Sequence, residues 1–504
     1  MGRRAVAAVV SLWVVSISVV VDRIVPDPYM DEIFHIPQAQ RYCGGDLRSW
    51  DPMITTPPGL YCLSLAYIGA LFPGISFMKP SGTFSEVCST SFLRSTNGVL
   101  AVICSIIMYD ILIHLRPNIG DRRVTIYAIC VALYPVHWFF SFLYYTDVAS
   151  TTAVLAMFLA SLKGHHWISS LLGAIAVFIR QTNVIWILFI ASNAAIDHVE
   201  AISQKYNVQS GDSASLLMED EVVLNESRFE TKSKLRRRFQ HSTKSVRPSI
   251  SERSSLVHEL YAIILKMWRF KWRLLISFFP FILVLAGFMT FVFWNGSIVL
   301  GAKEDHVASP HFAQMMYFGL ISAAATAPLH FNSTQFTYLL EPFWKKRTTG
   351  ILQWLVALVV GFVSVHWFSI AHPYLLADNR HYTFYFWRKI IRAHWASKYL
   401  MIPLCIYCLF SIGSILGKSR GRTWALSFFL ACSAALVPAP LVEFRYYTVP
   451  IILFLLNSQV DSQISWALTS ALFVATDVSP CRCSSSGPSS GRTSQESRDS
   501  SGSI

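Results

Sequence analysis

Two adjacent carboxylates near the start of the chain could do chemistry. Asp31 and Glu32 open a short amphipathic stretch, and His35 follows them one helical turn later. A carboxylate can take a proton from an attacking hydroxyl group, so the pair could supply a general base. The alternative is an ordinary acidic first turn, because a helix dipole favours anions at its N-terminus. His35 beside two carboxylates could ligate a metal, but we see no convincing cluster of ligands and expect no metal or other cofactor.

A second set of polar residues could bind an anionic phosphate. It comprises His372, Asp378, Arg380 and His381 in one loop, Glu443, Arg445 and Tyr446 in another, Arg180 within an apolar hairpin, and His35 of the first loop. A guanidinium group can bind phosphate through two parallel hydrogen bonds, which favours the arginines. A purely structural role stays open for each site. Arg380 and His381 could be basic residues at the membrane border that extend their charged ends toward water. Arg445 could pair locally with Glu443, and Arg180 could pair with Asp147.

The composition indicates what kind of protein must position these residues. The chain has 504 residues, of which 53% are hydrophobic and only 14% are charged, against about 25% charged in an ordinary soluble domain. So few charges cannot cover a soluble surface, which excludes a soluble enzyme, a nucleic-acid-binding protein and a disordered protein. We predict an all-α polytopic membrane protein surrounded by membrane lipids. The net charge of +13 fits basic cytosolic loops better than binding to nucleic acid.

Apolar runs predict about 12 transmembrane helices. The first, over residues 5–21, follows Arg3 and Arg4 and reads as an uncleaved anchor, since no cleavage pattern follows it. The other predicted spans cover residues 94–115, 124–141, 148–162, 167–179, 184–195, 274–293, 312–328, 351–370, 399–413, 424–437 and 448–456.

The basic loops predict the orientation. The segment 59–72 is apolar but short, so it suits an interfacial helix better than a span. If it does not cross, the basic loops all fall on one side, which the positive-inside rule assigns to the cytosol. The N-terminus is then cytosolic. The loop 22–93 and the loops that carry the phosphate-binding candidates face the lumen.

This topology divides the chain into modules. We expect an N-terminal transmembrane module over residues 1–197 and a C-terminal module over residues 272–460, which carries most of the luminal donor-site loops. The segment 198–271 between them is polar, Ser-rich and basic, so we predict a mostly disordered solvated linker rather than a lipid-binding segment. The tail 479–504 is rich in Ser, Gly and Arg, and we assign it no fold.

The ten cysteines add one expectation. Cys43, Cys62 and Cys88 share the loop 22–93 and could form a disulfide in an oxidising lumen, with the pairing left open. Cys405 and Cys408 have the spacing of a zinc site, but they lie in an apolar run without a second ligand pair. We therefore interpret them as buried core residues.

The chain resembles a known family, the endoplasmic-reticulum dolichyl-phosphate-glucose α-1,2-glucosyltransferases. The resemblance runs from Pro28 to about Pro450 and rests on several long strings in one order. The strings are Tyr-Met-Asp-Glu-Ile-Phe-His-Ile-Pro-Gln-Ala-Gln (29–40), Trp-Asp-Pro-Met-Ile-Thr-Thr-Pro-Pro-Gly-Leu-Tyr (50–61), Phe-Ile-Arg-Gln-Thr-Asn (178–183), Asn-Gly-Ser-Ile-Val-Leu-Gly (295–301) and His-Pro-Tyr-Leu-Leu-Ala-Asp-Asn-Arg-His-Tyr (372–382).

This resemblance implies the type-C glycosyltransferase fold, with interfacial helices in the first luminal loop and a luminal active site. It implies dolichyl-phosphate-glucose as the donor and a diglucosylated lipid-linked oligosaccharide as the acceptor, in the last assembly step before protein N-glycosylation. The donor is β-linked and the product α-linked, so one displacement with one base suffices. Asp31 is the expected base and Glu32 its helper, although the reverse stays open. Arg380, His381 and Arg445 are the expected partners of the departing phosphate.

Two features depart from the family. Its members usually have proline at the position of Phe444, and a further hydrophobic span is expected where this chain has its Ser-rich tail. The second departure keeps open a catalytically impaired membrane scaffold. A transporter is a weaker alternative, because its charges would line a path and would often come with inverted repeats. We find no such repeat, and the catalytic-looking residues gather on one face.

Overall fold

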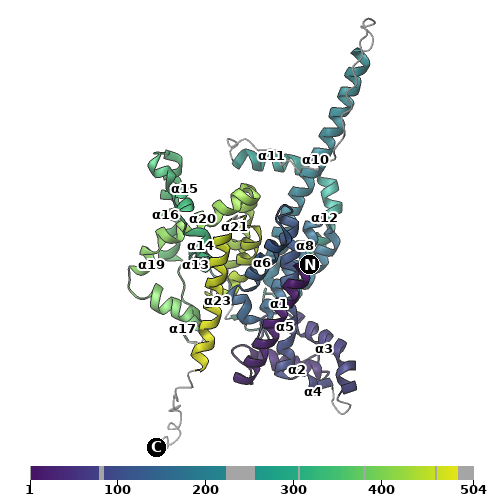
Figure 1. Ribbon diagram of the computed structural model, residues 1–504, viewed down its shortest axis with the longest axis vertical. Coiled ribbons are helices and arrows are strands. Elements are labelled where there is room, and N and C mark those ends of the chain that lie inside the picture. Colours follow the sequence, from purple (N-terminus) through teal and green to yellow (C-terminus); the bar gives the residue numbers. More distant parts are fainter. Residues whose placement is uncertain are drawn as a thin grey trace, which may run out of the picture.

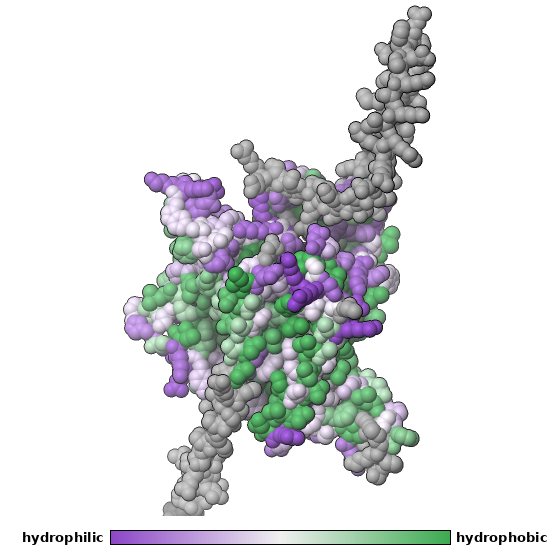
Figure 2. All heavy atoms as spheres, viewed as in Figure 1, coloured by the Kyte–Doolittle hydropathy of each residue, from purple (hydrophilic) through white to green (hydrophobic). Residues whose placement is uncertain are grey.

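The structure is a computed structural model that describes residues 2–78, 84–222, 256–304, 307–377, 382–459 and 462–485. These residues form helices and no strand, so the predicted all-α class is confirmed. Six of the helical segments in this part of the chain are long and apolar enough to cross a membrane, and shorter apolar helices accompany them. Figure 2 shows hydrophobic side chains in a broad middle band, with hydrophilic side chains gathered toward the upper and lower ends. The chain is a multi-pass membrane protein.

Figure 1 shows how the helices are arranged. In order they are α1 (Gly2–Ile24), α2 (Glu32–Cys43), α3 (Gly59–Met78), α4 (Phe84–Val87), α5 (Thr90–Leu115), α6 (Asp121–Ala132), α7 (Pro135–Phe140), α8 (Thr146–Leu162), α9 (His166–Ile179), η1 (Gln181–Asn183), α10 (Val184–Val222), α11 (Leu256–Arg269), α12 (Lys271–Asn295), α13 (Ala313–Ala325), α14 (Ala327–His330), α15 (Ser333–Trp344), α16 (Thr348–Trp367), α17 (Pro373–Ala377), α18 (Tyr382–Phe386), η3 (Trp387–Ile391), α19 (Ser397–Leu400), α20 (Ile402–Arg420), α21 (Arg422–Leu436), η4 (Phe444–Tyr447), α22 (Thr448–Asn457) and α23 (Gln463–Ser485).

Each predicted span overlaps at least one of these helices, and three spans are divided between two helices. The run 312–328 covers α13 and the start of α14, and the run 399–413 covers the end of α19 and much of α20. The run 124–141 forms two helices, α6 and α7, instead of one. Tyr134 between them is not helical, with φ −55° and ψ 121°. The reason is Pro135, because a proline ring disfavours the α conformation in the residue before it.

Helix α22 lies at the centre of the bundle. All of its residues are buried, and it contacts α5, α6 and α8 from the first third of the chain and α20 from its last quarter. Its sequence is apolar on every face, which is typical of a helix that is surrounded by protein. Because η4 leads directly into α22, the residues of η4 are held at the end of this buried helix.

Helix α23 is an element that the sequence did not predict. It packs between α6 and α7 on one side and α13 and α14 on the other. Trp466 and Phe473 are buried, and the Trp466 ring stacks on Tyr127 with 4.7 Å between centroids. Its Ser and Thr residues lower the hydropathy but allow close packing between helices. The helix continues past residue 479 to Ser485, so the prediction that no fold begins there is wrong for residues 479–485.

The segment 198–271 is also more helical than predicted. Helix α10 continues through its first part to Val222, and α11 occupies residues from Leu256 to Arg269. The prediction of a mostly disordered linker is wrong for these two parts, and residues 223–255 lie outside the described residues. Serines and charges dominate the composition of the whole segment, which obscured the apolar periodicity of α11.

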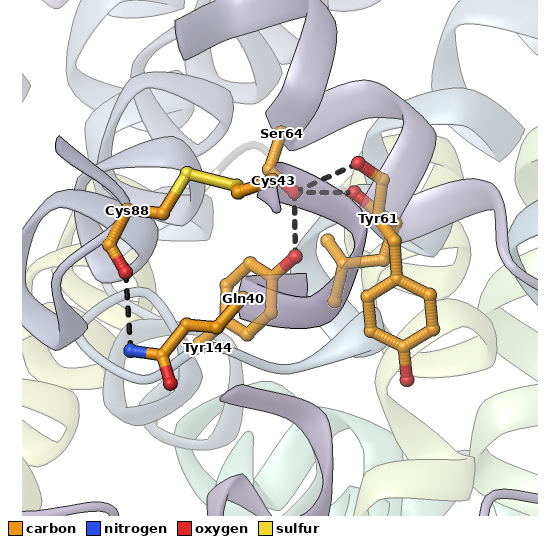
Figure 3. Close-up of a disulfide and its surroundings, with 7 residues drawn as sticks. Gln40, Cys43, Tyr61, Ser64, Cys88 and Tyr144 are labelled. Atoms are coloured by element: carbon orange, nitrogen blue, oxygen red, sulfur yellow. Dashed lines mark hydrogen bonds between the residues drawn. A yellow bond between two sulfur atoms is a disulfide. The ribbon is translucent and has the colours of Figure 1, made fainter. Parts of the chain in front are cut away.

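Helices α2, α3 and α4 form a group beside α5 at one end of the molecule, the lower end in Figure 1. A disulfide between Cys43 and Cys88 closes this group (Figure 3). The Gln40 side chain donates a hydrogen bond to the Cys88 carbonyl at 3.2 Å. The pairing that the sequence left open is therefore Cys43 with Cys88, and Cys62 is an exposed free thiol.

Removing this disulfide is expected to destabilise the group of α2, α3 and α4. The cysteines are 45 residues apart, and the chain-entropy treatment of a loop of that size gives about 4 kcal/mol. We expect a Cys43→Ser, Cys88→Ser variant to be cleaved faster by added protease within residues 44–58. Cys62→Ser is the matched control, and equal cleavage of the two variants would contradict a structural role for the bond.

Candidate active site

The two adjacent carboxylates have opposite environments. Asp31 is the residue before the first turn of α2, and its side chain is 41% exposed. Glu32 is the first residue of α2, and its side chain is fully buried. Met30 in front of them is buried in the left-handed region at φ 56°, which is strained for a residue other than glycine. Consecutive residues at the start of a helix point about 100° apart, so the two side chains meet different surroundings.

The Glu32 carboxylate is held by four donors. One oxygen accepts from Arg94 Nε at 3.0 Å and from the Tyr144 amide at 2.6 Å. The other accepts from Arg94 Nη2 at 2.6 Å and from the Tyr29 amide at 2.9 Å. Two donors on each oxygen leave Glu32 little capacity to accept a proton from a substrate.

Arg94 fastens the beginning of the first loop to α5. Its side chain is only 3% exposed. Besides Glu32, it binds the Asp22 carboxylate at 3.2 Å and the carbonyls of Val25 and Asp27 at 2.7 and 3.0 Å. The sequence did not predict this role, because Arg94 is the first residue of an apolar run and is typical of the end of a membrane span. The available signal was a lone arginine next to a span in a loop rich in carboxylates.

Asp31 contacts two residues from distant parts of the chain. Its backbone amide donates to the Tyr145 hydroxyl at 2.5 Å. Its carboxylate lies 3.0 Å from Arg445 Nη1 in η4. A nearby cation favours the charged form of a carboxylate. The structure therefore brings together Asp31 and Arg445, which are 414 positions apart in the sequence.

Arg445 lies in a mostly buried setting of acidic and aromatic groups. Its Nε is 3.7 Å from Glu443, and its guanidinium carbon lies 5.7 Å from the Phe140 ring centroid and 5.5 Å from that of Tyr145. The Nε atom has no hydrogen-bond partner within the described residues. The local Glu443–Arg445 pair is thus present, but Arg445 also reaches Asp31.

Phe444 explains how the departure from the family pattern is accommodated. It is the first residue of the short helix η4. The first position of a helix tolerates proline because its amide needs no partner within the helix, so proline and phenylalanine can begin the same turn. The Phe444 ring packs 5.8 Å from Phe386 and 6.1 Å from Tyr447 between ring centroids. Tyr446 follows Arg445 and is half-buried.

Arg180 pairs with Asp147, one of the two alternatives that the sequence offered. Its guanidinium binds the two Asp147 oxygens at 3.0 and 3.1 Å and the Thr146 hydroxyl at 3.0 Å. Asp147 is the second residue of α8, where the helix dipole also favours a carboxylate. The pair locks the end of α9 to the start of α8.

His35 contacts aromatic neighbours and no carboxylate. Its Nδ1 is 2.6 Å from the Tyr61 hydroxyl, and its ring lies 5.9 Å from the Tyr145 ring between centroids. The pKa of His35 is lowered to about 4, chiefly by burial; Asp31 opposes this shift and Arg445 adds to it. His35 is therefore neutral near pH 7 and offers a hydrogen bond rather than a positive charge.

Three of the sequence strings that carry the resemblance dock against one another. The Thr55 carbonyl accepts from the Gln181 side chain at 2.9 Å and from the Leu300 amide at 3.1 Å. Gly301 lies against the carbonyl of Pro52 so closely that a side chain would collide with it. Gly59 lies equally close to the Phe178 carbonyl. The segments 178–183 and 295–301 therefore pack directly against residues 52–59 of the first loop.

The segment from His372 to Tyr382 is described only in part. His372 precedes α17, and its carbonyl accepts from the Leu375 amide at 3.1 Å. Asp378, Arg380 and His381 lie outside the described residues. Leu375 of α17 and Phe386 of α18 belong to the same apolar cluster as Val442, just before Arg445. In the part of the chain that is described, no group of three acidic, His or Cys side chains could hold a metal ion.

Comparison with known proteins shows the family to which the chain belongs. Residues 25–456 match the DIE2/ALG10 family. The chain is 52% identical to the Arabidopsis thaliana protein named Dol-P-Glc:Glc(2)Man(9)GlcNAc(2)-PP-Dol alpha-1,2-glucosyltransferase, over 95% of each chain. Proteins of the same name from Mus musculus and Homo sapiens are 34% and 35% identical, over 86% of this chain and 85% of each relative. No solved structure matches the chain. The family match and these identities place the chain in the DIE2/ALG10 family.

Proposed function

We propose that this protein transfers glucose from dolichyl-phosphate-glucose to a lipid-linked oligosaccharide that already carries two glucoses, through an α-1,2 linkage. The names of the relatives support this reaction, which is the last step in assembling the oligosaccharide for protein N-glycosylation. The family resemblance of the segments 29–40, 50–61, 178–183 and 295–301 supports the same reaction. A transporter or an impaired scaffold has less support, because the similar proteins are named as transferases and Asp31 has an exposed carboxylate beside Arg445.

The difference in exposure between Asp31 and Glu32 supports the assignment of the general base. A general base must reach the hydroxyl proton of the acceptor, and Asp31 has an exposed carboxylate for this. Glu32 is enclosed and accepts four hydrogen bonds. Asp31 is therefore the proposed base, and Glu32 with Arg94 positions it.

The reaction is a single displacement. An acceptor hydroxyl oxygen attacks C1 of the donor glucose from the face opposite the phosphate, and its proton passes to Asp31. The C1–oxygen bond to the phosphate breaks, and its electron pair leaves with dolichyl phosphate. The resemblance implies a β-linked donor, so this attack gives the α linkage.

Arg445 is the proposed partner of the departing phosphate. Charge develops on the phosphate as the bond breaks, and a preorganised cation in a mostly buried site stabilises it. The Arg445 side chain is 14% exposed, and its Nη1 lies 3.0 Å from the proposed base. Arg380, His381, His372, Asp378, Glu443 and Tyr446 remain further candidates for substrate binding. Arg180 is a positioning residue in this account, because Asp147 holds its guanidinium.

The proposed location is the endoplasmic-reticulum membrane, with the active site in the lumen and the N-terminus in the cytosol. The Cys43–Cys88 disulfide lies in the same loop as Asp31, which fits an oxidising compartment. The basic loops fall on the opposite side in the predicted topology.

Purified protein in detergent tests the proposed reaction. With the diglucosylated lipid-linked oligosaccharide as acceptor, we expect dolichyl-phosphate-glucose to support glucose transfer and UDP-glucose to support none. Transfer from UDP-glucose alone would overturn the proposed donor, and absence of transfer from either would favour the scaffold.

Tyr145→Phe is expected to slow transfer about tenfold, because it leaves the buried Asp31 amide without its acceptor. We expect the effect mainly on the turnover number, since the base is displaced and not removed. Tyr144→Phe is the matched control: its hydroxyl bonds Ser64 at 2.5 Å, away from Asp31 (Figure 3). Equal losses in the two variants would show that only packing matters.

A further inference from the structure

Helix α11 carries an exposed apolar stripe that glucosyl transfer does not use. Val257, Tyr261, Ile264, Leu265 and Trp268 recur at the spacing of one helical face, and their exposed fractions lie between 51% and 74%. Contiguous exposed apolar surface of this kind marks an interaction site. The transfer reaction takes place among residues of other elements, so the stripe needs a separate explanation.

The other faces of α11 fix its orientation on the protein. The helix contacts α10, α12 and α21, and it lies crosswise to α10 (Figure 1). Met267 packs against the core. Glu259 pairs with Arg422 of α21 at 3.8 Å, and Arg269 lies over the Tyr206 ring at 4.8 Å. The stripe is therefore held outward by contacts on the other faces.

The C-terminal end of α11 has the composition of a membrane border. Lys266, Arg269, Lys271 and Arg273 gather where α11 meets α12, which is long and apolar enough to cross a membrane. Trp272 is 69% exposed, and Lys271 lies 4.3 Å from the ring centroid of Trp268. Tryptophan with basic residues at the start of a span is typical of the interface between lipid and water.

We propose that α11 lies in the bilayer surface, with its apolar stripe among the acyl chains and its basic end bound to the headgroups of anionic phospholipids. Three observations favour a lipid over a protein partner: the stripe continues into a membrane-crossing helix, tryptophans stand at the border, and the charges beside it are basic. The inference stands on the membrane placement and does not depend on the proposed reaction.

Photocrosslinking of the full-length protein tests the insertion. The photoreactive residue p-benzoylphenylalanine replaces Ile264 on the stripe or Ala262 on the polar face, in nanodiscs of phosphatidylcholine and phosphatidylserine. We expect phospholipid adducts at position 264 and few at position 262. Adducts to protein alone at position 264, no adduct there, or equal lipid adducts at both positions would overturn the proposal.

The ratio of phosphatidylserine to phosphatidylcholine adducts at position 264 tests the headgroup preference. Each basic residue near an anionic surface favours binding about fivefold. Adding Lys271→Gln and Arg273→Gln is therefore expected to lower this ratio toward that of the bulk lipid. Lys346→Gln, at an exposed position between α15 and α16, is the matched control. A ratio that the double variant leaves unchanged would overturn the anionic preference.

Discussion

Replacing Asp31 with asparagine is expected to lower the turnover number for glucosyl transfer by about 10²- to 10⁴-fold, the usual contribution of a general base. Asparagine keeps the size of the side chain and the backbone bond to Tyr145, so the loop should stay in place. It cannot take the hydroxyl proton. Initial rates over a range of dolichyl-phosphate-glucose concentrations measure the loss, which should fall on the turnover number more than on KM.

Asp46→Asn is the matched control for this variant. Asp46 lies in the same loop, and its carboxylate accepts from the amides of Arg48 and Ser49 at 3.2 and 3.1 Å. Asparagine can still accept these bonds, so near-normal transfer is expected. Nearly full activity of Asp31→Asn would instead remove Asp31 from the base role and direct attention to Glu32.

Arg94→Met is expected to cost about 3–5 kcal/mol of stability, since removing one partner of a buried ion pair leaves the other charge uncompensated. Glu32 would lose its bonds from Arg94 Nε and Nη2 inside the protein. The carbonyls of Val25 and Asp27 would lose their donor as well. The measurement is the unfolding temperature of the purified protein, together with the yield of folded protein.

Arg3→Met is the matched control for Arg94→Met. Arg3 also binds a carboxylate through more than one bond, from Asp110, but its side chain is 61% exposed. An exposed pair of this kind contributes about 0–1 kcal/mol. A double variant, Arg94→Met with Glu32→Leu, should recover much of the lost stability because no buried charge remains. Equal effects of Arg94→Met and Arg3→Met would refute the anchoring role.

The sequence predicted the helical membrane class and the first loop as the catalytic one, because carboxylates and apolar periodicity are local signals. It could not separate Asp31 from Glu32. The separation comes from Arg94 and the Tyr144 amide, which approach Glu32 from α5 and from the turn before α8. Such contacts depend on how helices pack, and the spacing of residues in one segment does not contain them.

Helix α23 is an element of the fold that could not be predicted from the sequence. Its polar residues lower the hydropathy on which a span prediction relies, yet it packs against α6, α7, α13 and α14 with Trp466 and Phe473 buried. For Arg180, in contrast, the sequence did offer the correct partner. Its position in an apolar hairpin required a partner, and Asp147 was a correct candidate because both flank neighbouring helices.

The anomeric configuration and linkage of the product test the central claim most directly. Purified protein is incubated with dolichyl-phosphate-glucose carrying ¹³C at C1 of glucose and with the diglucosylated acceptor, and the isolated product is analysed by nuclear magnetic resonance. Attack by one hydroxyl with Asp31 as the base predicts an α-configured glucose on the 2-position of the terminal residue, formed by the wild-type protein and nearly absent with Asp31→Asn. A β-configured product, or an α product formed equally by both proteins, would contradict the single displacement at Asp31.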